Sequence, residues 1–292
     1  MAVREFRRAP RVLPLYARAL APMLPGASRL PWVAGGGGGV PDLQLTLADV
    51  RVDRRRLACY AQVCGSFPRE RLPSTYPHVL AFPLHMALMT DRSFPFPAIG
   101  LVHVNNRIRV HRAVGVEEPL DLRVHATPLK EHAKGRTFTI VTEVRVAEEL
   151  MWEEHSTMLR RGIGEASAAD RAAAVALPSL MEPNEWRLPA NLGRRYARVS
   201  GDRNPIHLHA LSARPFGFPR AIAHGMWTKA RCLAALQATL PDAYTVQVSF
   251  RKPIFLPARV TFAQAHEHSR MSFAVRSGED EAVIHLEGTV SR

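Results

Sequence analysis

The sequence has few cysteines and no long apolar run. Its three cysteines, Cys59, Cys64 and Cys232, all stand among apolar neighbours in a chain of 292 residues. So small and odd a number is typical of a protein in a reducing compartment, and we expect none of the three to be catalytic. No run approaches the ~18 to 20 apolar residues of a membrane-spanning helix. These absences predict a cytoplasmic protein without a membrane span.

Acidic residues are scarce beside basic ones. The chain has 26 Asp and Glu against 39 Lys and Arg, a formal net charge of +13 and a pI near 10.7. A basic surface attracts nucleic acids, anionic membranes or phosphorylated ligands. Because zinc-knuckle spacing, helix-turn-helix signals and RNP-type aromatic motifs are all missing, we expect no nucleic-acid partner. The 47% hydrophobic and 22% charged content predicts a globular chain of about two domains.

The first 40 residues are predicted to form an irregular lead. Glu5 is the only acid before Gly26, a composition that a transit peptide would share. Four prolines, however, would interrupt the amphipathic helix of such a peptide: Pro10, Pro14, Pro22 and Pro25. We expect some helix over residues 15–20, packing of the lead against the body, and a flexible hinge or surface loop at Gly35–Gly39.

From Pro41 onward the chain repeats itself. Tyr60–Gly65 (YAQVCG) parallels Tyr196–Gly201 (YARVSG), at an offset of 196 − 60 = 136. Val102–Val104 parallels Val246–Val248, at an offset of 246 − 102 = 144. The two offsets differ by the length of intervening loops, so we predict two related halves.

Each half is predicted to be one helix followed by antiparallel strands. The halves span residues 41–161 and 185–292, and an Ala-rich linker, residues 162–184, joins them. Alternating or apolar runs predict the strands at residues 120–124, 137–146, 150–159, 260–265, 271–275 and 282–290. This is the α+β order in which a curved antiparallel sheet wraps around a central helix.

The two central helices differ in character. Ala221–Leu240 is apolar on nearly every face, which predicts a helix surrounded by protein. Gly225, in its first turn, would leave backbone N–H groups and the positive end of the helix dipole open to an oxygen that gains negative charge. The helix of the first half, near His78–Asp91, contains Pro83, which is expected to break or displace it.

Proton-transfer groups are concentrated in the loop before the second helix. Within six residues stand an acid, Asp202, a carboxamide, Asn204, and an imidazole, His207. Gly201 and Pro205 restrict the backbone, so the loop can hold both ionisable side chains towards one small volume. A carboxylate and an imidazole that share one water can each relay a proton near neutral pH.

Each of these groups also has a simpler interpretation. Asp202 is equally suited to capping a helix or closing a turn. His207 and His209 form an H-x-H pair of the kind that binds metals, but no further ligand stands at a recognisable spacing, so we expect no metal. His224 is interpreted first as a buried, hydrogen-bonded histidine, with substrate binding as the alternative. The order in which the residues occur together is more informative than any one of them.

That order is Y-A-x-V-S-G-D-x-N-P-I-H, then F-G-F, then I-A-H-G-M, within Tyr196–Thr228. It strongly resembles the MaoC-like family of (R)-specific enoyl-CoA hydratases and 3-hydroxyacyl-thioester dehydratases. The close match covers about 33 residues, and the rest of the second half is compatible with it. One departure is Leu256–Arg259 (LPAR), where the family usually has a Pro-Gly-Asp turn.

The resemblance assigns roles by position. It implies that Asp202 and His207 bind the water that adds across the enoyl double bond. It implies that Gly225 supplies an N–H group to the developing oxyanion. Ser200 and Asn204 would be supporting members of the same loop. Which of the carboxylate and the imidazole acts as acid and which as base stays open at this point.

The resemblance also implies two tandem hotdog folds whose sheets pair edge to edge as a pseudo-dimer, with one active site between them. The first half is degenerate, because the offset of 136 places Asp202 on Ser66 and His207 on Arg71. In related double-hotdog dehydratases the helix of this half makes room for the acyl chain. Candidates for a tail pocket, with ordinary core packing as the alternative, are Phe82, Leu84, Met86 and Met89.

The function implied is reversible hydration of trans-2-enoyl-CoA to (R)-3-hydroxyacyl-CoA, with coenzyme A as part of the substrate and no cofactor. The same reaction on acyl carrier protein is one alternative, and a non-catalytic acyl-thioester binder is another. Arg251 and Lys252 are candidates for phosphate contacts, with a solvated face as the simpler interpretation. We also expect a possible homodimer of double hotdogs.

Overall fold

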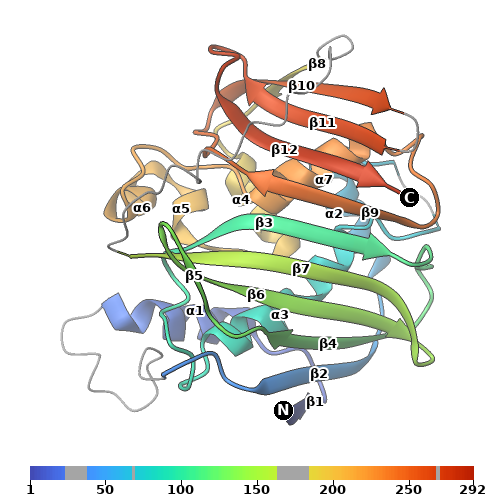
Figure 1. Cartoon of the computed structure of the whole chain (residues 1–292), viewed down its shortest axis with the longest axis vertical. Helices are drawn as coiled ribbons and strands as arrows, with labels where there is room; N and C mark the ends of the chain where they lie inside the picture. Colours follow the sequence, from blue (N-terminus) through green and yellow to red (C-terminus); the bar gives the residue numbers. More distant parts are fainter. Residues whose placement is uncertain (24–37, 68–69, 163–183, 268–269) are drawn as a thin grey trace.

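One mixed β-sheet organises the protein. The computed structural model describes residues 1–23, 38–67, 70–162, 184–267 and 270–292. Its strands follow the order β1-β2-β4-β6-β7-β3-β9-β12-β11-β10-β8, with β5 against β6 (Figure 1). Among the strands of the described ranges, β1 and β2 alone pair in parallel; the neighbouring pairs from β2 to β8 are antiparallel. The strands are β1 (Ala2–Phe6), β2 (Leu43–Val50), β3 (Leu101–Val110), β4 (Leu120–Ala126), β5 (Lys130–His132), β6 (Gly135–Val146), β7 (Glu149–Arg161), β8 (Asn184–Leu188), β9 (Tyr244–Phe250), β10 (Ala258–Glu267), β11 (Arg270–Ser277) and β12 (Ile284–Ser291).

The helices lie on one side of this sheet, behind it in the view of Figure 1. They are α1 (Val12–Leu20), the short 3₁₀ helix η1 (Ala21–Met23), α2 (Arg54–Cys64), α3 (Tyr76–Met89), α4 (Leu192–Ser200), α5 (Pro205–Leu208), α6 (Ala210–Ala213), the 3₁₀ helix η4 (Arg214–Phe216) and α7 (Gly225–Ala235). The predicted strands of both halves are confirmed as β4, β6, β7, β10, β11 and β12. None of the described helices combines the length and the apolar character that crossing a membrane requires.

The two halves meet where β3 and β9 pair. The offset of 144 maps Asn105 onto Ser249 (249 − 105 = 144), and these two residues are direct partners in the antiparallel ladder. Their side chains also bond, with Ser249 Oγ donating to Asn105 Oδ1 over 2.8 Å. A residue that pairs with its own counterpart marks a local two-fold axis. The predicted edge-to-edge union of two hotdog sheets is therefore confirmed.

The helices preserve the repeat as well. Both α2 and α4 end at a glycine in the left-handed region, Gly65 at φ 73° and Gly201 at φ 80°. The rings of Tyr60 and Tyr196, which the repeat aligns, lie 6.1 Å apart between centroids. A left-handed residue that ends a helix is strained for any side chain with a Cβ, which accounts for glycine at both places.

One prediction about the first half is wrong. Pro83 does not break its helix, because α3 continues without interruption from Tyr76 to Met89. Ten of its fourteen residues are buried, and this packing outweighs the ~3 kcal/mol that an internal proline costs. In the lead, the expected helix and its packing against the body are confirmed, since α1 lies against α3 and buries Leu15, Tyr16 and Ala19. The strand β1, which extends the sheet beside β2, was not predicted.

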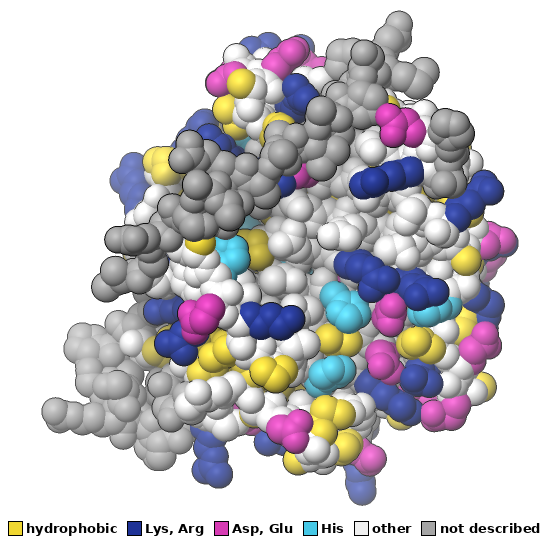
Figure 2. Space-filling view, viewed as in Figure 1, with side chains coloured by type: hydrophobic (Ala, Val, Ile, Leu, Met, Phe, Trp, Pro, Cys, Tyr) yellow, Lys and Arg dark blue, Asp and Glu magenta, His cyan; other side chains and the backbone are white. Residues whose placement is uncertain are grey.

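The sheet separates a solvated face from the core. Figure 2 shows basic, acidic and histidine side chains over the strands of the first half on the outward face. The inward face meets the helices with large buried side chains such as Trp152, Phe138 and Phe273. This alternation is what a strand with one wet face requires, and it places any enclosed site on the helical side.

Some predictions concern residues outside the described ranges. Most of the linker, residues 163–183, and the first part of the glycine hinge, Gly35–Gly37, belong there. The domain boundaries therefore stay predictions. At the departure from the family turn, the Leu256–Pro257 peptide bond is cis and Ala258 begins β10.

Candidate active site

The loop between α4 and α5 is fixed by its own polar side chains. Ser200 Oγ donates to the Tyr196 carbonyl (2.9 Å) and accepts from the Asp202 N–H (3.1 Å). Asn204 caps α5, its Oδ1 accepting from the Ile206 N–H over 3.4 Å. These short-range bonds hold the backbone around Asp202 in one conformation. Ser200 therefore fixes the loop without lining the cavity, whereas Asn204 both fixes the loop and lines the cavity.

The Asp202 carboxylate accepts hydrogen bonds from two donors. Its Oδ1 accepts from the Tyr16 hydroxyl (2.8 Å) and from the Asn204 N–H (3.1 Å). Burial alone would raise the pKa of this carboxyl, but His224, His207 and the two hydrogen bonds together lower its pKa below the ordinary value. Asp202 is therefore ionised at neutral pH.

His207 presents an unprotonated nitrogen beside that carboxylate. Its Nδ1 lies 2.8 Å from the Ile222 carbonyl, and because a carbonyl oxygen only accepts, Nδ1 carries the proton. Burial lowers the pKa of the ring below its ordinary value, although the Asp202 charge opposes this. The imidazole is therefore neutral at neutral pH, with its lone pair on Nε2. This is the form of histidine that accepts a proton.

His224 stacks on His207. The two ring centroids are 3.7 Å apart and the planes are inclined by 24°. His224 Nε2 lies 3.1 Å from the Asp202 backbone carbonyl and 3.7 Å from its carboxylate. Burial lowers the pKa of His224 to about 3, so its ring is uncharged at neutral pH. It is thus a buried, hydrogen-bonded histidine that also lines the cavity.

The three side chains converge as the loop pattern predicts. One ligand atom from each of Asp202, His207 and His224 lies within 4.8 Å of the others. The set offers the atom types that bind a divalent metal, and equally those that hold a water. His209 does not join it, since that ring is exposed and accepts from the Leu211 N–H (3.3 Å). The absence of a metal stays a prediction.

Gly225 is the first residue of α7, so its N–H has no acceptor within the helix. It lines the same cavity as Asp202 and His207. A Cβ at this position would lie 2.9 Å from the ring of Phe250, closer than packed carbons tolerate. Glycine thus lets Phe250 pack against the start of α7. The free N–H of Gly225 lies at the positive end of the helix dipole, at the cavity.

The cavity measures about 390 Å³ and takes its walls from both halves. Phe82 and Met89 of α3 line it, but Leu84 and Met86 do not and are buried in the core. Positions 82 and 89 are seven residues apart, two helical turns, so they share a face that 84 and 86 do not. Of the tail-pocket candidates, the structure places only this pair at the cavity.

The two cationic candidates also line the cavity, at exposed positions after β9. Arg251 is engaged, because its guanidinium pairs with the Glu287 carboxylate, Nε donating over 2.8 Å. Lys252 is exposed and has no ion pair among the described residues. Of the two, Lys252 is the one whose charge is available to an anionic ligand.

The related position in the first half is a smaller pocket of about 110 Å³. Ser66 and Arg71, the counterparts of Asp202 and His207, both line it. The Arg71 guanidinium pairs there with the exposed Asp242 carboxylate. A hydroxyl and a guanidinium cannot replace a carboxylate and a neutral imidazole in proton transfer, so only the second half is equipped for this chemistry.

Tyr16 is a site residue that no sequence pattern indicated. It comes from α1, and its hydroxyl donates to Asp202 Oδ1 and accepts from the Arg203 N–H, both over 2.8 Å. Burial and the neighbouring carboxylate raise the pKa of Tyr16, so the hydroxyl stays protonated. The lead thereby holds the Asp202 carboxylate in place.

Tyr16→Phe is expected to lower kcat about tenfold with little change in KM, because the ring still packs while Asp202 loses one charge-assisted bond. Steady-state kinetics on an enoyl thioester, with Tm measured alongside, tests this. Tyr244→Phe, a buried tyrosine at the smaller pocket, is the matched control. A wild-type kcat in Tyr16→Phe would remove Tyr16 from the site.

Comparison with known proteins agrees with this geometry. Residues 183–286 match the family model described as "MaoC like domain". The chain is 38% identical to 3-hydroxyacyl-thioester dehydratase X of Mycobacterium tuberculosis, over 75% of this chain and 79% of that protein. The crystal structure of HtdX from the same organism superposes with a TM-score of 0.74 at 34% identity, covering 85% of this chain and 98% of that one. A MaoC-like dehydratase from Phytophthora capsici, 18% identical with a TM-score of 0.71, shares the fold over 85% of this chain and 94% of its own. The chain therefore belongs to the MaoC-like dehydratase family.

Proposed function

We propose that this enzyme catalyses the reversible hydration of trans-2-enoyl-CoA to (R)-3-hydroxyacyl-CoA. The observation that carries the proposal is the meeting of an ionised carboxylate, Asp202, and a neutral imidazole, His207, beside the first turn of α7. The similar dehydratase of M. tuberculosis is named for 3-hydroxyacyl thioesters. A hydro-lyase acting on acyl thioesters in fatty acyl metabolism is consistent with both.

One proton moves in this mechanism. At neutral pH the Asp202 carboxylate is ionised and His207 Nε2 carries no proton, so neither group brings a proton to the reacting carbons. In the dehydration direction, His207 Nε2 takes the proton from the α-carbon, and the electron pair moves onto the thioester oxygen as an enolate. The C–O bond at the β-carbon then breaks as the imidazolium returns that proton to the leaving hydroxyl, which departs as water. Hydration is the same sequence reversed.

The other residues stabilise what this transfer creates. The Gly225 N–H and the positive end of α7 stabilise the enolate oxygen, an effect worth a few kcal/mol for a well-placed donor. The Asp202 carboxylate stabilises the imidazolium and accepts a hydrogen bond from the water. Because one ring serves both carbons, removal and return of the proton occur on the same face of the substrate. A syn reaction follows.

The test is an absorbance screen at the enoyl-thioester band over short, medium, long and branched trans-2-enoyl-CoA substrates. We expect the band to disappear and the product to be the (R) isomer in a stereospecific coupled assay. Tight binding of the thioesters without any loss of the band would support the non-catalytic binder instead. An (S) product would contradict the proposed stereochemistry of the reaction.

The carrier is proposed to be coenzyme A, with acyl carrier protein as the alternative that the basic surface also suits. We expect a higher kcat/KM for the same acyl group on coenzyme A.

Lys252→Ala should raise KM for the CoA substrate about threefold to fivefold at low salt, as an exposed charge contact allows, and less at high salt. Lys130→Ala, an exposed lysine of β5 away from the cavity, is the control. If kcat/KM were higher on acyl carrier protein, and Lys252→Ala left KM for the CoA substrate unchanged, the carrier would be acyl carrier protein and not coenzyme A.

A further inference from the structure

The cavity has a second polar region that the hydration mechanism does not use. Its first-half wall carries three imidazoles, His78 and His85 from α3 and His103 from β3. The α3 residues that line the cavity, 78, 82, 85 and 89, repeat at helical spacing, so histidines alternate with Phe82 and Met89 along one face. A pocket that served only a hydrocarbon chain would be apolar there.

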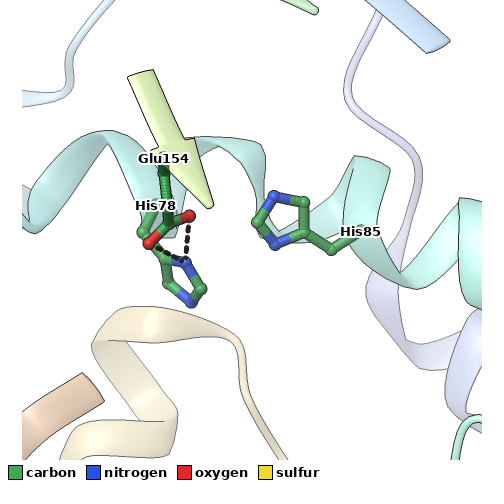
Figure 3. Close-up of side chains that lie close together, drawn as sticks. All are labelled: His78, His85 and Glu154. Carbon is green, nitrogen blue, oxygen red and sulfur yellow. Dashed lines mark hydrogen bonds and ion pairs between the residues drawn. The ribbon is translucent and has the colours of Figure 1, made fainter. Parts of the chain in front are cut away.

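His78 is oriented by a buried carboxylate. Its Nδ1 lies 2.8 and 3.1 Å from the two carboxylate oxygens of Glu154, a residue with no exposed surface (Figure 3). Burial opposes ionisation of Glu154, but His78, His85 and Asn106 lower its pKa to about 2. The carboxylate therefore stays charged and Nδ1 holds the proton. Nε2, on the opposite side of the ring, is the nitrogen left for a ligand.

A hydrogen-bonded chain stands behind this pair. Asn106 Nδ2 donates to Glu154 Oε1 (2.7 Å) and to Ser156 Oγ (3.0 Å), and Asn106 Oδ1 accepts from the fully buried Lys229 ammonium. Burying the Glu154 carboxylate and the Lys229 amine, whose pKa burial lowers to about 7, costs more than an apolar filling of the same volume unless the geometry serves a further purpose. Here the hydrogen-bonded chain ends at the ring of His78, which lines the cavity.

An unsubstituted hydrocarbon would be a poor ligand beside these rings. It would displace water from His78 Nε2 and leave that nitrogen unpaired, and His103 Nε2 is already buried without a partner among the described residues. His85 differs, since its Nε2 is 2.7 Å from Thr142 Oγ1. Two unpaired ring nitrogens, His78 Nε2 and His103 Nε2, therefore border the space where the acyl chain would lie.

A metal is less suited to this place. His78, His85 and Glu154 have ligand atoms within 4.8 Å of one another. However, Nδ1 of His78 and the carboxylate are bonded directly to each other, and Asn106 donates to the same carboxylate. An ion would have to break these bonds before it could bind. A small hydrogen-bond donor on the ligand fits the existing bonds without disturbing them.

The position of this region relates it to the acyl chain. Phe82, one turn beyond His78, packs against the catalytic loop, where its Cδ1 lies 3.6 Å from the place of a Cβ on Gly201. A chain that extends from Asp202 past Phe82 enters the first half among His78, His85 and His103. The thioester end remains with Gly225 and Lys252.

We propose that His78 and His103 form a binding site for a hydroxyl group on the acyl chain, beyond the carbons that react. The substrate class is then a hydroxylated trans-2-enoyl thioester. The hydroxyl donates its proton to one of these two ring nitrogens, and His78 Nε2 is an acceptor because Nδ1 holds that ring's proton. This inference rests on the proposed hydratase function, and it narrows the substrate of that same cavity.

The experiment compares kcat/KM of the wild-type enzyme for a plain medium-chain enoyl-CoA and for the same chain with one hydroxyl, moved one carbon at a time towards the chain end. At one position or two adjacent positions we expect a preference of about tenfold or more for the hydroxylated chain. A ketone at the preferred carbon should not recover this preference, because a ketone cannot donate a hydrogen bond.

His78→Leu should abolish this preference, lowering kcat/KM for the hydroxylated chain about tenfold more than for the plain chain. Since the change leaves Glu154 unpaired, the double variant His78→Leu/Glu154→Gln provides the same readout without a lone buried charge. His155→Leu, the neighbour of Glu154 on the opposite face of β7, is the matched control and should keep the wild-type ratio.

Three results would overturn the proposal. One is a wild-type enzyme that hydrates plain chains and prefers no hydroxylated one, which leaves the hydratase function intact. Another is an equal loss on both chains in His78→Leu and in the double variant, which would indicate a role in proton transfer or folding. Absence of hydration with every chain, plain or hydroxylated, would overturn this site and the proposed function together.

Discussion

Asp202→Asn is expected to lower kcat/KM for enoyl-CoA hydration about 1,000-fold while the protein stays folded. The amide has the same shape, so Oδ1 can still accept from the Tyr16 hydroxyl and the Asn204 N–H. It has no negative charge, however, and cannot stabilise the imidazolium that forms on His207. The loss should therefore fall on kcat more than on KM, which is the pattern of an interaction made in the transition state.

The matched control for this change is Asp242→Asn, an exposed carboxylate that pairs with Arg71 at the smaller pocket. It removes one negative charge from a place without proton-transfer groups, so kcat/KM should stay within about twofold of wild type. Circular dichroism and Tm establish that both variants are folded. If Asp202→Asn retained wild-type turnover, the catalytic assignment of this carboxylate would be wrong.

His207→Gln should be at least as damaging, with a loss of about 1,000-fold or more in kcat. The glutamine amide can still donate to the Ile222 carbonyl, but it has no nitrogen that accepts a proton at neutral pH. His266→Gln, at an exposed position of β10, is the control. A variant that kept more than about a tenth of wild-type kcat would move the base to another residue.

The pH dependence of the wild-type enzyme provides a second check on His207. Its neutral form is the active one, and burial lowers its pKa below the ordinary ~6.5 of histidine. Acidification must therefore go below that ordinary value before the ring is protonated. We expect kcat/KM to be constant through neutral pH and to fall only at more acidic pH, whereas a fall that begins near pH 7 would contradict the assignment.

The residues of the catalytic loop could be predicted because they are close in sequence. Gly201 and Pro205 limit the backbone over a few residues, so the convergence of Asp202 and His207 follows from local geometry. The pairing of the two sheets could likewise be predicted, because the offset between the repeated strands is equal to the register at Asn105 and Ser249.

What could not be predicted depends on contacts between distant segments. Tyr16 reaches Asp202 across 186 positions of sequence, and its segment has no motif that indicates a partner. His78 and Glu154 come from a helix and a strand that the fold alone brings together. Met86 was expected at the cavity because the helix is apolar all round, which hides its orientation. Cytoplasmic location and a homodimer of double hotdogs stay predictions.

The junction of β3 and β9 has a consequence for how such an enzyme can change. In a symmetric dimer of identical chains, any substitution that reshapes the cavity appears at both sites and alters the chemistry wherever it alters the fit of the substrate. Covalent fusion removes that coupling, so each copy accepts its own substitutions. Here one copy retains the reactive loop and the other has diverged to shape the space beside it. Substitutions in the first half can thus adapt the cavity to new substrates without changing the residues that make and break bonds.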